Sequence, residues 1–210
     1  DDPMLQVLLS ENRSVFSFGI KNAADINASS PQIRGNRLKF VVKSRYNMEL
    51  GAFAGHNVYN AICSILAARF FGIDYNTIKR RLKSFKFPTG RLNLIRRRDF
   101  ILMDDSYNAN PLSAEKALLA LSDFNTSGRK IFILGDMLEL GDREGHMHKA
   151  LCPKIKSSCD IFISVGRLAS LAAEELKQSG FDSSRVFICD SSMQAKKALF
   201  NSVRPRRGDV

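Results

Sequence analysis

Two stretches of the sequence are rich in carboxylate and amide side chains whose spacing suits ligand binding. The first is DDSYNANP, residues 104–111, and the second is GDMLELG, residues 135–141. Asp105 offers a carboxylate that can accept hydrogen bonds from two vicinal hydroxyls, as in ribose recognition. The amides of Asn108 and Asn110 can hold a carboxylate or a peptide group. The two stretches therefore indicate a polar ligand that carries hydroxyl and carboxylate groups.

Ordinary helix and turn chemistry explains part of the same stretches. Asn110 is a good helix N-cap, and Pro111 suits the first helical position. Gly135 and Gly141 allow backbone angles that are closed to other residues. A structural and a functional interpretation both stay open for these residues.

Two further signals are weaker when each is taken alone. His56 and Asn60 lie four residues apart in GHNVYN, on one face of a helix start, where free N–H groups suit phosphates or adenine. Such a pair is more often structural. Arg91 follows the Pro-Thr-Gly turn at 88–90, from which its guanidinium could cross a cleft between two domains to a phosphate. The alternative is that Arg91 joins a solvated basic face with residues 96–98.

Several other kinds of site are excluded by their missing motifs. The sequence has no G-x-G-x-x-G, no G-x-x-x-x-G-K-[ST] and no G-x-S-x-G. His146 and His148 are two residues apart and do not share a helix face, and the cysteines lack zinc-like spacing, so no metal site is expected.

Cys63 and Cys189 lie in apolar periodic segments and are expected in the core. Free thiols favour a reducing compartment, the cytoplasm.

The formal net charge of +11 raises the question of a nucleic-acid partner. Basic clusters occur at residues 79–81, 96–98 and 204–207, but no nucleic-acid motif accompanies them, and aromatic residues do not interleave with them. We interpret them as solvated faces and expect no nucleic-acid partner. No run of ~18 apolar residues exists, so no membrane span is expected either.

The first half of the chain predicts a sheet followed by helices. Short alternating stretches at 15–20 and 38–42 indicate antiparallel strands or the edge of a mixed sheet. A helix is predicted from residue 55, ending near Gly72, and Asp74 is expected to cap a second, shorter helix. The apolar face of the first helix is expected to comprise Val58, Ala61, Ile62, Ile65, Leu66 and Phe70.

The second half alternates apolar strands with amphipathic helices. The predicted strands are residues 100–104, 130–135, 161–166 and 186–190, and the predicted helices are 112–124, part of 142–158, 167–179 and 192–203. This order indicates a doubly wound, mostly parallel sheet that is covered on both faces. Ligands of such sheets gather at the carboxyl ends of the strands, where DDSYNANP and GDMLELG are expected.

Taken in order, GHNVYN, GRL after a Pro-Thr turn, DDSYNANP and ILGDMLELG resemble the Mur ligases. The resemblance implies an α/β protein: the end of a central ATPase domain, residues 1–88, followed by a doubly wound, mostly parallel Rossmann-like domain, residues 89–210, truncated at its end. It implies an ATP- and Mg²⁺-dependent amide ligase that is cytoplasmic and monomeric. Its substrates would be a UDP-N-acetylmuramoyl-tripeptide and D-alanyl-D-alanine.

The resemblance also implies roles for individual residues. The residues expected to bind the nucleotide are His56, Asn57 and Asn60 at adenine, Arg91 at the phosphates and Asp105 at the ribose. The residues expected near D-alanyl-D-alanine are Asn108, Asn110, Asp136 and Met137.

The resemblance places the family's phosphate loop, magnesium-binding glutamate and carbamylated lysine upstream of Asp1, so no catalytic residue is expected in these 210 residues and the fragment alone is expected to be inactive. The alternative is a non-catalytic α/β module that binds nucleotide or nucleic acid.

Overall fold

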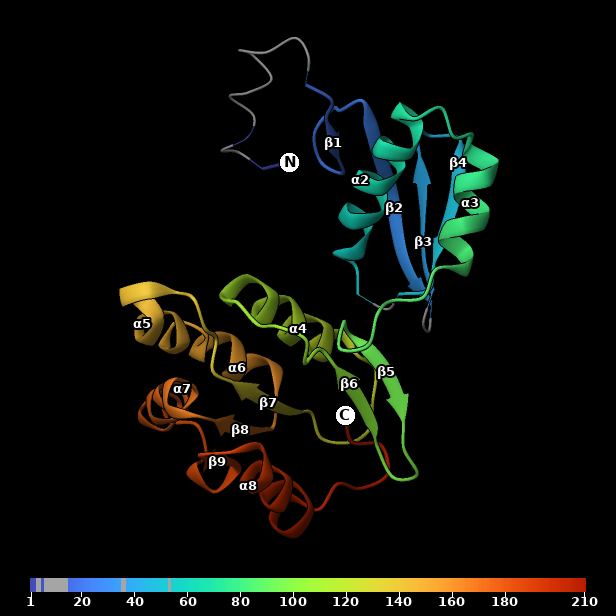
Figure 1. Cartoon of the computed structure of the whole chain (residues 1–210). Helices are drawn as coiled ribbons and strands as arrows, with labels where there is room; N and C mark the ends of the chain where they lie inside the picture. The colour runs from blue at the N-terminus through green and yellow to red at the C-terminus, as the bar shows by residue number, and fades with distance from the viewer. Residues whose placement is uncertain (3–4, 6–14, 35–36, 53) are drawn as a thin grey trace. The chain divides into compact units, whose positions relative to one another are not determined.

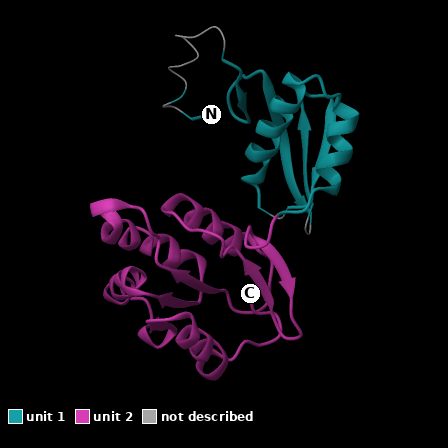
Figure 2. Ribbon diagram, viewed as in Figure 1, with its two compact units in different colours: residues 1–87 teal, residues 88–210 magenta. Residues whose placement is uncertain are grey.

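The chain forms two compact units in a computed structural model, which describes residues 1–2, 5, 15–34, 37–52 and 54–210. Unit 1 is Asp1–Phe87 and unit 2 is Pro88–Val210 (Figure 2). Each unit has its own hydrophobic core. Within the described residues, no helix combines the length and the apolar character that a membrane crossing requires.

Unit 1 is a mixed sheet with helices packed on it, the second of the two arrangements that the sequence allowed. Its strands, in spatial order, are β1 (Phe18–Gly19), β2 (Ile26–Arg34), β3 (Arg37–Val42) and β4 (Tyr46–Leu50). β1 is parallel to β2, and the other pairs are antiparallel. Alternate residues of β3, including Leu38 and Phe40, are buried in the core shared with helices α2 (Asn57–Phe70) and α3 (Tyr75–Ser84) (Figure 1).

The helices of unit 1 begin and end largely as the sequence predicts. The Asp74 carboxylate accepts hydrogen bonds from the N–H groups of Asn76 and Thr77, at 2.9 and 3.0 Å, and so caps α3. Two expectations for α2 are wrong. Phe70 is 67% exposed, because its ring lies against Phe16 and Phe71 beyond the core. Cys63 is exposed because it lies outside the buried stripe of α2.

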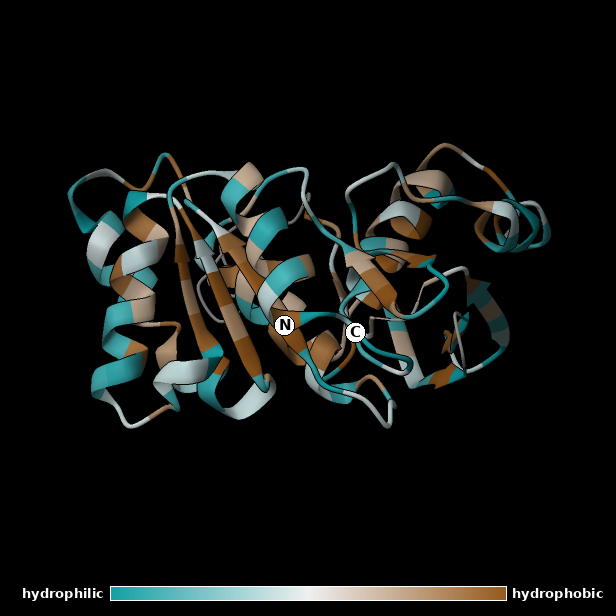
Figure 3. Ribbon diagram, turned by 90° about the horizontal axis from the view of Figure 1, so that it is seen from below, coloured by the Kyte–Doolittle hydropathy of each residue, from teal (hydrophilic) through white to brown (hydrophobic). Residues whose placement is uncertain are grey.

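Unit 2 contains the predicted parallel sheet, with β8 (Ile161–Val165) between β7 (Ile131–Gly135) and β9 (Val186–Cys189). One face packs against α4 (Pro111–Asp123), α6 (Cys152–Ser158) and α7 (Arg167–Gln178), and the other against α8 (Ser192–Lys197) and the π-helical turn η3 (Ala198–Val203). The strands are mainly hydrophobic, whereas the helices carry both kinds of residue (Figure 3). The doubly wound prediction is confirmed.

Several details of unit 2 differ from the predicted pattern. The helix expected within 142–158 is broken into η1 (Gly141–Arg143), α5 (Glu144–Lys149) and α6. The expected strand at 100–104 is β6 (Ile101–Asp104), and it pairs in antiparallel fashion with β5 (Asn93–Arg96), which the sequence pattern did not predict.

The end of the chain joins β6 to the parallel sheet. The carbonyl of Asp209 accepts from Ile101 N–H at 2.9 Å, and the carbonyl of Val210 accepts from Ile131 N–H at 2.7 Å. Asp209 and Val210 therefore lie between β6 and β7, parallel to both (Figure 1). As a result, the loops that follow β6 and β7 leave the sheet at the same edge, its carboxyl edge.

Candidate functional site

The turn at 90–92 is packed against the loop that follows β6. Tyr107 N–H donates to the Gly90 carbonyl at 3.2 Å, and Leu92 N–H donates to Asp105 Oδ1 at 3.0 Å. Gly90 has a φ of +76°, and a Cβ there would lie 3.0 Å from Tyr107 N, so a side chain at position 90 would strain this contact. The packing brings Arg91 and Asp105, two of the predicted nucleotide-binding residues, to the same place.

Arg91, Asp105 and Tyr107 combine a cation, an anion and an aromatic ring. The guanidinium carbon of Arg91 lies 4.1 Å from the centre of the Tyr107 ring, in a cation–π contact. Asp105 is half-buried, and this burial raises the pKa of its carboxyl, while the Leu92 N–H and the Arg91 charge act in the opposite direction. The arrangement offers a positive group for a phosphate beside an acceptor for hydroxyls.

Tyr107 was not among the residues predicted from the sequence. Its ring is 69% exposed and supports the Arg91 guanidinium. A tyrosine in a polar loop at the carboxyl edge was the available signal, but its partner lies 16 residues earlier in the chain.

The two asparagines of DDSYNANP have different surroundings. Asn110 caps α4: its Oδ1 accepts from Ser113 N–H at 2.8 Å, and its own N–H donates to Ser113 Oγ at 2.9 Å. Asn108 is exposed, and its Oδ1 accepts from the adjacent Ala109 N–H at 2.9 Å. The structural interpretation therefore accounts for Asn110, whereas Asn108 is exposed and is not the N-cap of α4.

Replacing Asn110 with alanine should lower the free energy of unfolding of the chain by about 1 kcal/mol, because the Ser113 N–H at the start of α4 loses its side-chain acceptor. Asn108→Ala, the matched control, should change it by less than about 0.5 kcal/mol. Urea denaturation followed by circular dichroism measures both values. Equal losses in the two variants would contradict the capping role.

The loop after β7 is tied into the fold by Asp136. Its Oδ1 accepts from the N–H groups of Leu168 and Ala169, at 2.9 and 2.7 Å, at the start of α7. A Cβ at Gly166 would lie 2.6 Å from this carboxylate, so glycine permits the approach. Met137 is fully buried in the core, which leaves its side chain no surface for a ligand. Leu138, 64% exposed, occupies the outer side of the loop instead.

His148 holds the same loop from inside the protein. The Met137 N–H donates to His148 Nε2 at 2.9 Å, so Nε2 carries no proton and the proton resides on Nδ1. Nδ1 donates to the Glu144 carbonyl at 2.7 Å, and the side chain is completely buried. His148 thus fixes the loop backbone, a role that its sequence position did not reveal. No three His, Cys, Asp or Glu side chains gather as a metal site in the part of the chain that the structure describes.

His56, Asn57 and Asn60 share the first turn of α2 in unit 1. Asn57 is 6% exposed, and its Oδ1 accepts from Asn60 Nδ2 at 3.1 Å. Asn60 is exposed, and His56 is half-buried at the N-cap position, where its side chain makes no capping hydrogen bond. The turn therefore leaves His56 partly and Asn60 largely accessible, while the buried Asn57 holds the Asn60 amide.

Comparisons with known proteins agree with this architecture. The family described as "Mur ligase, glutamate ligase domain" matches residues 90–210. Over its whole length the chain is 31% identical to the UDP-N-acetylmuramoyl-tripeptide–D-alanyl-D-alanine ligase of Bacillus subtilis (strain 168), covering 46% of that protein.

Two solved structures are similar to the chain. A crystal structure of MurF from Acinetobacter baumannii matches 97% of this chain and 44% of that one, with a TM-score of 0.82 and 26% identity. MurF ligase from Thermotoga maritima in complex with ADP matches 100% of this chain and 47% of that one, with a TM-score of 0.75 and 24% identity. The chain spans about half the length of the relatives it matches.

Proposed function

This chain belongs to the Mur ligase family, and we propose that it is the carboxy-terminal part of an ATP-dependent ligase that joins D-alanyl-D-alanine to a UDP-N-acetylmuramoyl-tripeptide. In this proposal unit 1 is the end of the central ATP-binding domain and unit 2 is the carboxy-terminal domain. The observation that carries it is the packing of the turn at 90–92 on the loop at 105–107, which brings Arg91 close enough for its charge to act on the Asp105 carboxyl.

The proposed reaction has two steps. ATP transfers its terminal phosphoryl group to the carboxylate of the tripeptide, which gives an acyl phosphate and ADP. The amine of D-alanyl-D-alanine then attacks the acyl carbon, phosphate leaves, and the nitrogen loses a proton as the amide forms. Magnesium would neutralise phosphate charge when bound, and we assign no ligand for it within the described residues.

The residues of this chain would bind and orient the reactants. Asp105 would accept hydrogen bonds from the ribose hydroxyls, and Arg91 would hold a phosphate. His56 and Asn60 would contact adenine, with Asn57 fixing Asn60. On the dipeptide side, the exposed amide of Asn108 would bind directly. Asn110, Asp136 and Met137 would shape the two loops, because the fold already uses their side chains.

Several finer properties complete the proposal. The four cysteines are free thiols, which favours the cytoplasm. We propose a monomer, as the family resemblance implies, without nucleic-acid or membrane partners, as the sequence pattern predicts.

Phosphate release by the full-length gene product tests this function. With ATP, Mg²⁺ and the UDP-tripeptide present, release should require D-alanyl-D-alanine and should not occur with L-alanine or D-glutamate in its place. Release that ignores the dipeptide would contradict the substrate assignment. Nucleotide or oligonucleotide binding without any turnover would favour the non-catalytic module instead.

Replacing Asp105 with asparagine should raise the KM for ATP about 10- to 100-fold in the full-length enzyme. The expected loss is that of a charge-assisted hydrogen bond, roughly 1.5–3 kcal/mol. Asp104→Asn is the matched control, because Asp104 Oδ1 is engaged by Ser106, whose Oγ donates to it at 2.6 Å. A similar rise in the KM for ATP in both variants would contradict a specific role of Asp105 in binding the ribose.

A further inference from the structure

A pocket of about 660 Å³ lies at the amino edge of the sheet of unit 2, opposite the candidate site. Its lining residues lie just before or at the start of β7, β8 and β9, at the end of η3 and near the end of the chain. The charged residues that line it are Arg129, Arg185, Arg206 and Arg207, together with Asp160 and Asp209. Ligands of parallel sheets usually gather at the carboxyl edge, so a basic pocket here needs its own explanation.

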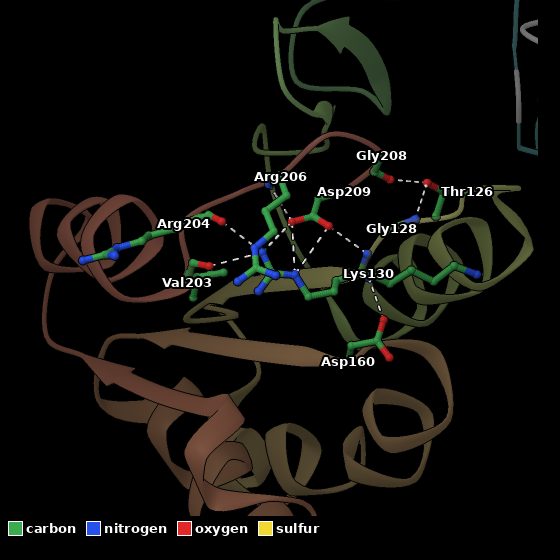
Figure 4. Close-up of polar contacts among 10 residues, drawn as sticks. Thr126, Gly128, Lys130, Asp160, Val203, Arg204, Arg206, Gly208 and Asp209 are labelled. Carbon is green, nitrogen blue, oxygen red and sulfur yellow. Dashed lines mark hydrogen bonds and ion pairs between the residues drawn. The ribbon is translucent and has the colours of Figure 1, made fainter.

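The fold accounts for one of these arginines. Arg129 Nη2 lies 2.6 Å from Asp209 Oδ2 and also donates to the carbonyls of Val203 and Arg204, at 3.2 and 3.0 Å. Asp209 is 2% exposed and accepts further bonds from the N–H groups of Arg129 and Arg206, at 2.8 and 2.9 Å (Figure 4). Burial favours the neutral carboxyl, but these bonds prevail and lower the pKa of Asp209. The charges of Arg129 and Asp209 therefore cancel within an ion pair that forms part of the pocket lining.

Within the part of the chain that the structure describes, the other three arginines of the pocket do not form ion pairs with a buried carboxylate. Among the described residues, no carboxylate lies within ion-pair distance of the Arg206 or Arg207 guanidinium. The backbone of Arg206 is nevertheless held, because its N–H donates to Asp209 Oδ2 and its carbonyl accepts from Asp209 N–H. Arg185 forms an ion pair with Asp182, in which Nε lies 3.2 Å from Oδ2. The pocket thus keeps an excess of positive charge on an ordered segment.

The wall of the pocket is partly apolar. Phe187, half-buried on β9, and Val203, 5% exposed at the end of η3, both line it. A volume of about 660 Å³ lies within the range typical of sites for small organic ligands. Arginine pairs recognise phosphate through short, directed hydrogen bonds. An apolar wall beside them suits a phosphate that carries an organic group better than it suits phosphate alone.

We propose that this pocket binds a small phosphate ester, with its phosphate on Arg206 and Arg207 and its organic part along Phe187 and Val203. The pocket lies at the opposite edge of the sheet from Arg91 and Asp105, so it would be a second site, separate from the proposed nucleotide site. The inference does not depend on the proposed function, since it uses only the contacts at the amino edge.

Isothermal titration of the 210-residue chain with uridine monophosphate and with inorganic phosphate tests the proposal. The nucleotide should bind saturably at one site and more tightly than phosphate. The double variant Arg206→Ala/Arg207→Ala should weaken it at least about tenfold, the equivalent of one charge-assisted hydrogen bond. Arg97→Ala/Arg98→Ala removes the same charge from the β5–β6 loop and should leave binding unchanged.

Four outcomes would overturn the proposal. The first is the absence of saturable binding, and the second is equal weakening in both double variants, which would indicate general charge attraction. The third is equal affinity for phosphate and nucleotide, which would show that Phe187 and Val203 do not contribute to binding. The fourth is binding of a single-stranded oligonucleotide that requires both arginine clusters, which would indicate a nucleic-acid surface. Circular dichroism must show native folding in each variant.

Discussion

Replacing His148 with alanine should lower the free energy of unfolding of unit 2 by about 3 kcal/mol, because it leaves two buried polar groups without partners and opens a cavity. The Met137 N–H and the Glu144 carbonyl would both lose the imidazole, at a position with no exposed surface. His146→Ala is the matched control, since His146 is exposed on the same short helix, α5. It should change the free energy by less than about 0.5 kcal/mol.

Hydrogen exchange of the Met137 amide separates the role of His148 from simple core packing. In His148→Ala this amide should exchange faster than its neighbours in β7, because its acceptor is lost. His148→Asn should recover part of the stability, since an amide can still donate to the Glu144 carbonyl. An unchanged rate at Met137, together with full destabilisation, would show that His148 acts through packing volume alone.

The parallel sheet of unit 2 was predictable because its strands carry their signal locally. β7, β8 and β9 are continuous apolar runs, and each is followed by an amphipathic helix. β5 lacked such a signal, because its four residues become a strand only by pairing with β6. The pairing of Asp209 and Val210 with two strands is likewise tertiary. Phe70 was wrongly included in the buried face of α2, because helical periodicity cannot show where the sheet beneath the helix ends.

The candidate site was predictable only where residue type alone restricts the role. Arg91 and Asp105 are charged residues in a turn and at the end of a strand, and the structure brings them together. Tyr107 contacts Arg91, 16 residues earlier in the sequence, and His148 accepts from the N–H of Met137, 11 residues earlier. No local sequence pattern encodes either contact. Met137 looked like a loop residue from its neighbours, yet its side chain turns into the core.

Replacing Arg91 with alanine should lower kcat of the full-length ligase about 10³-fold, the lower limit for an arginine that stabilises charge during phosphoryl transfer. Arg91→Lys should also impair turnover, because an ammonium keeps the charge but loses the planar fork that holds two phosphate oxygens. The Tyr107 ring fixes the guanidinium at 4.1 Å, so Tyr107→Leu should give a smaller fall in the same direction. Arg98→Lys, on the exposed β5–β6 loop, is the control.

The division of the effect between kcat and KM decides what Arg91 does. Arg91 follows the boundary between the two units, at Phe87 and Pro88. Under the proposed function, Arg91 contacts an ATP phosphate mainly in the reacting state, and such an interaction lowers kcat more than it raises the KM for ATP. A rise in KM at unchanged kcat would instead make Arg91 a ground-state binding residue. Wild-type kinetics in both Arg91 variants would place it on a solvated basic face with its neighbours at 96–98, and would remove Arg91 from the proposed nucleotide site.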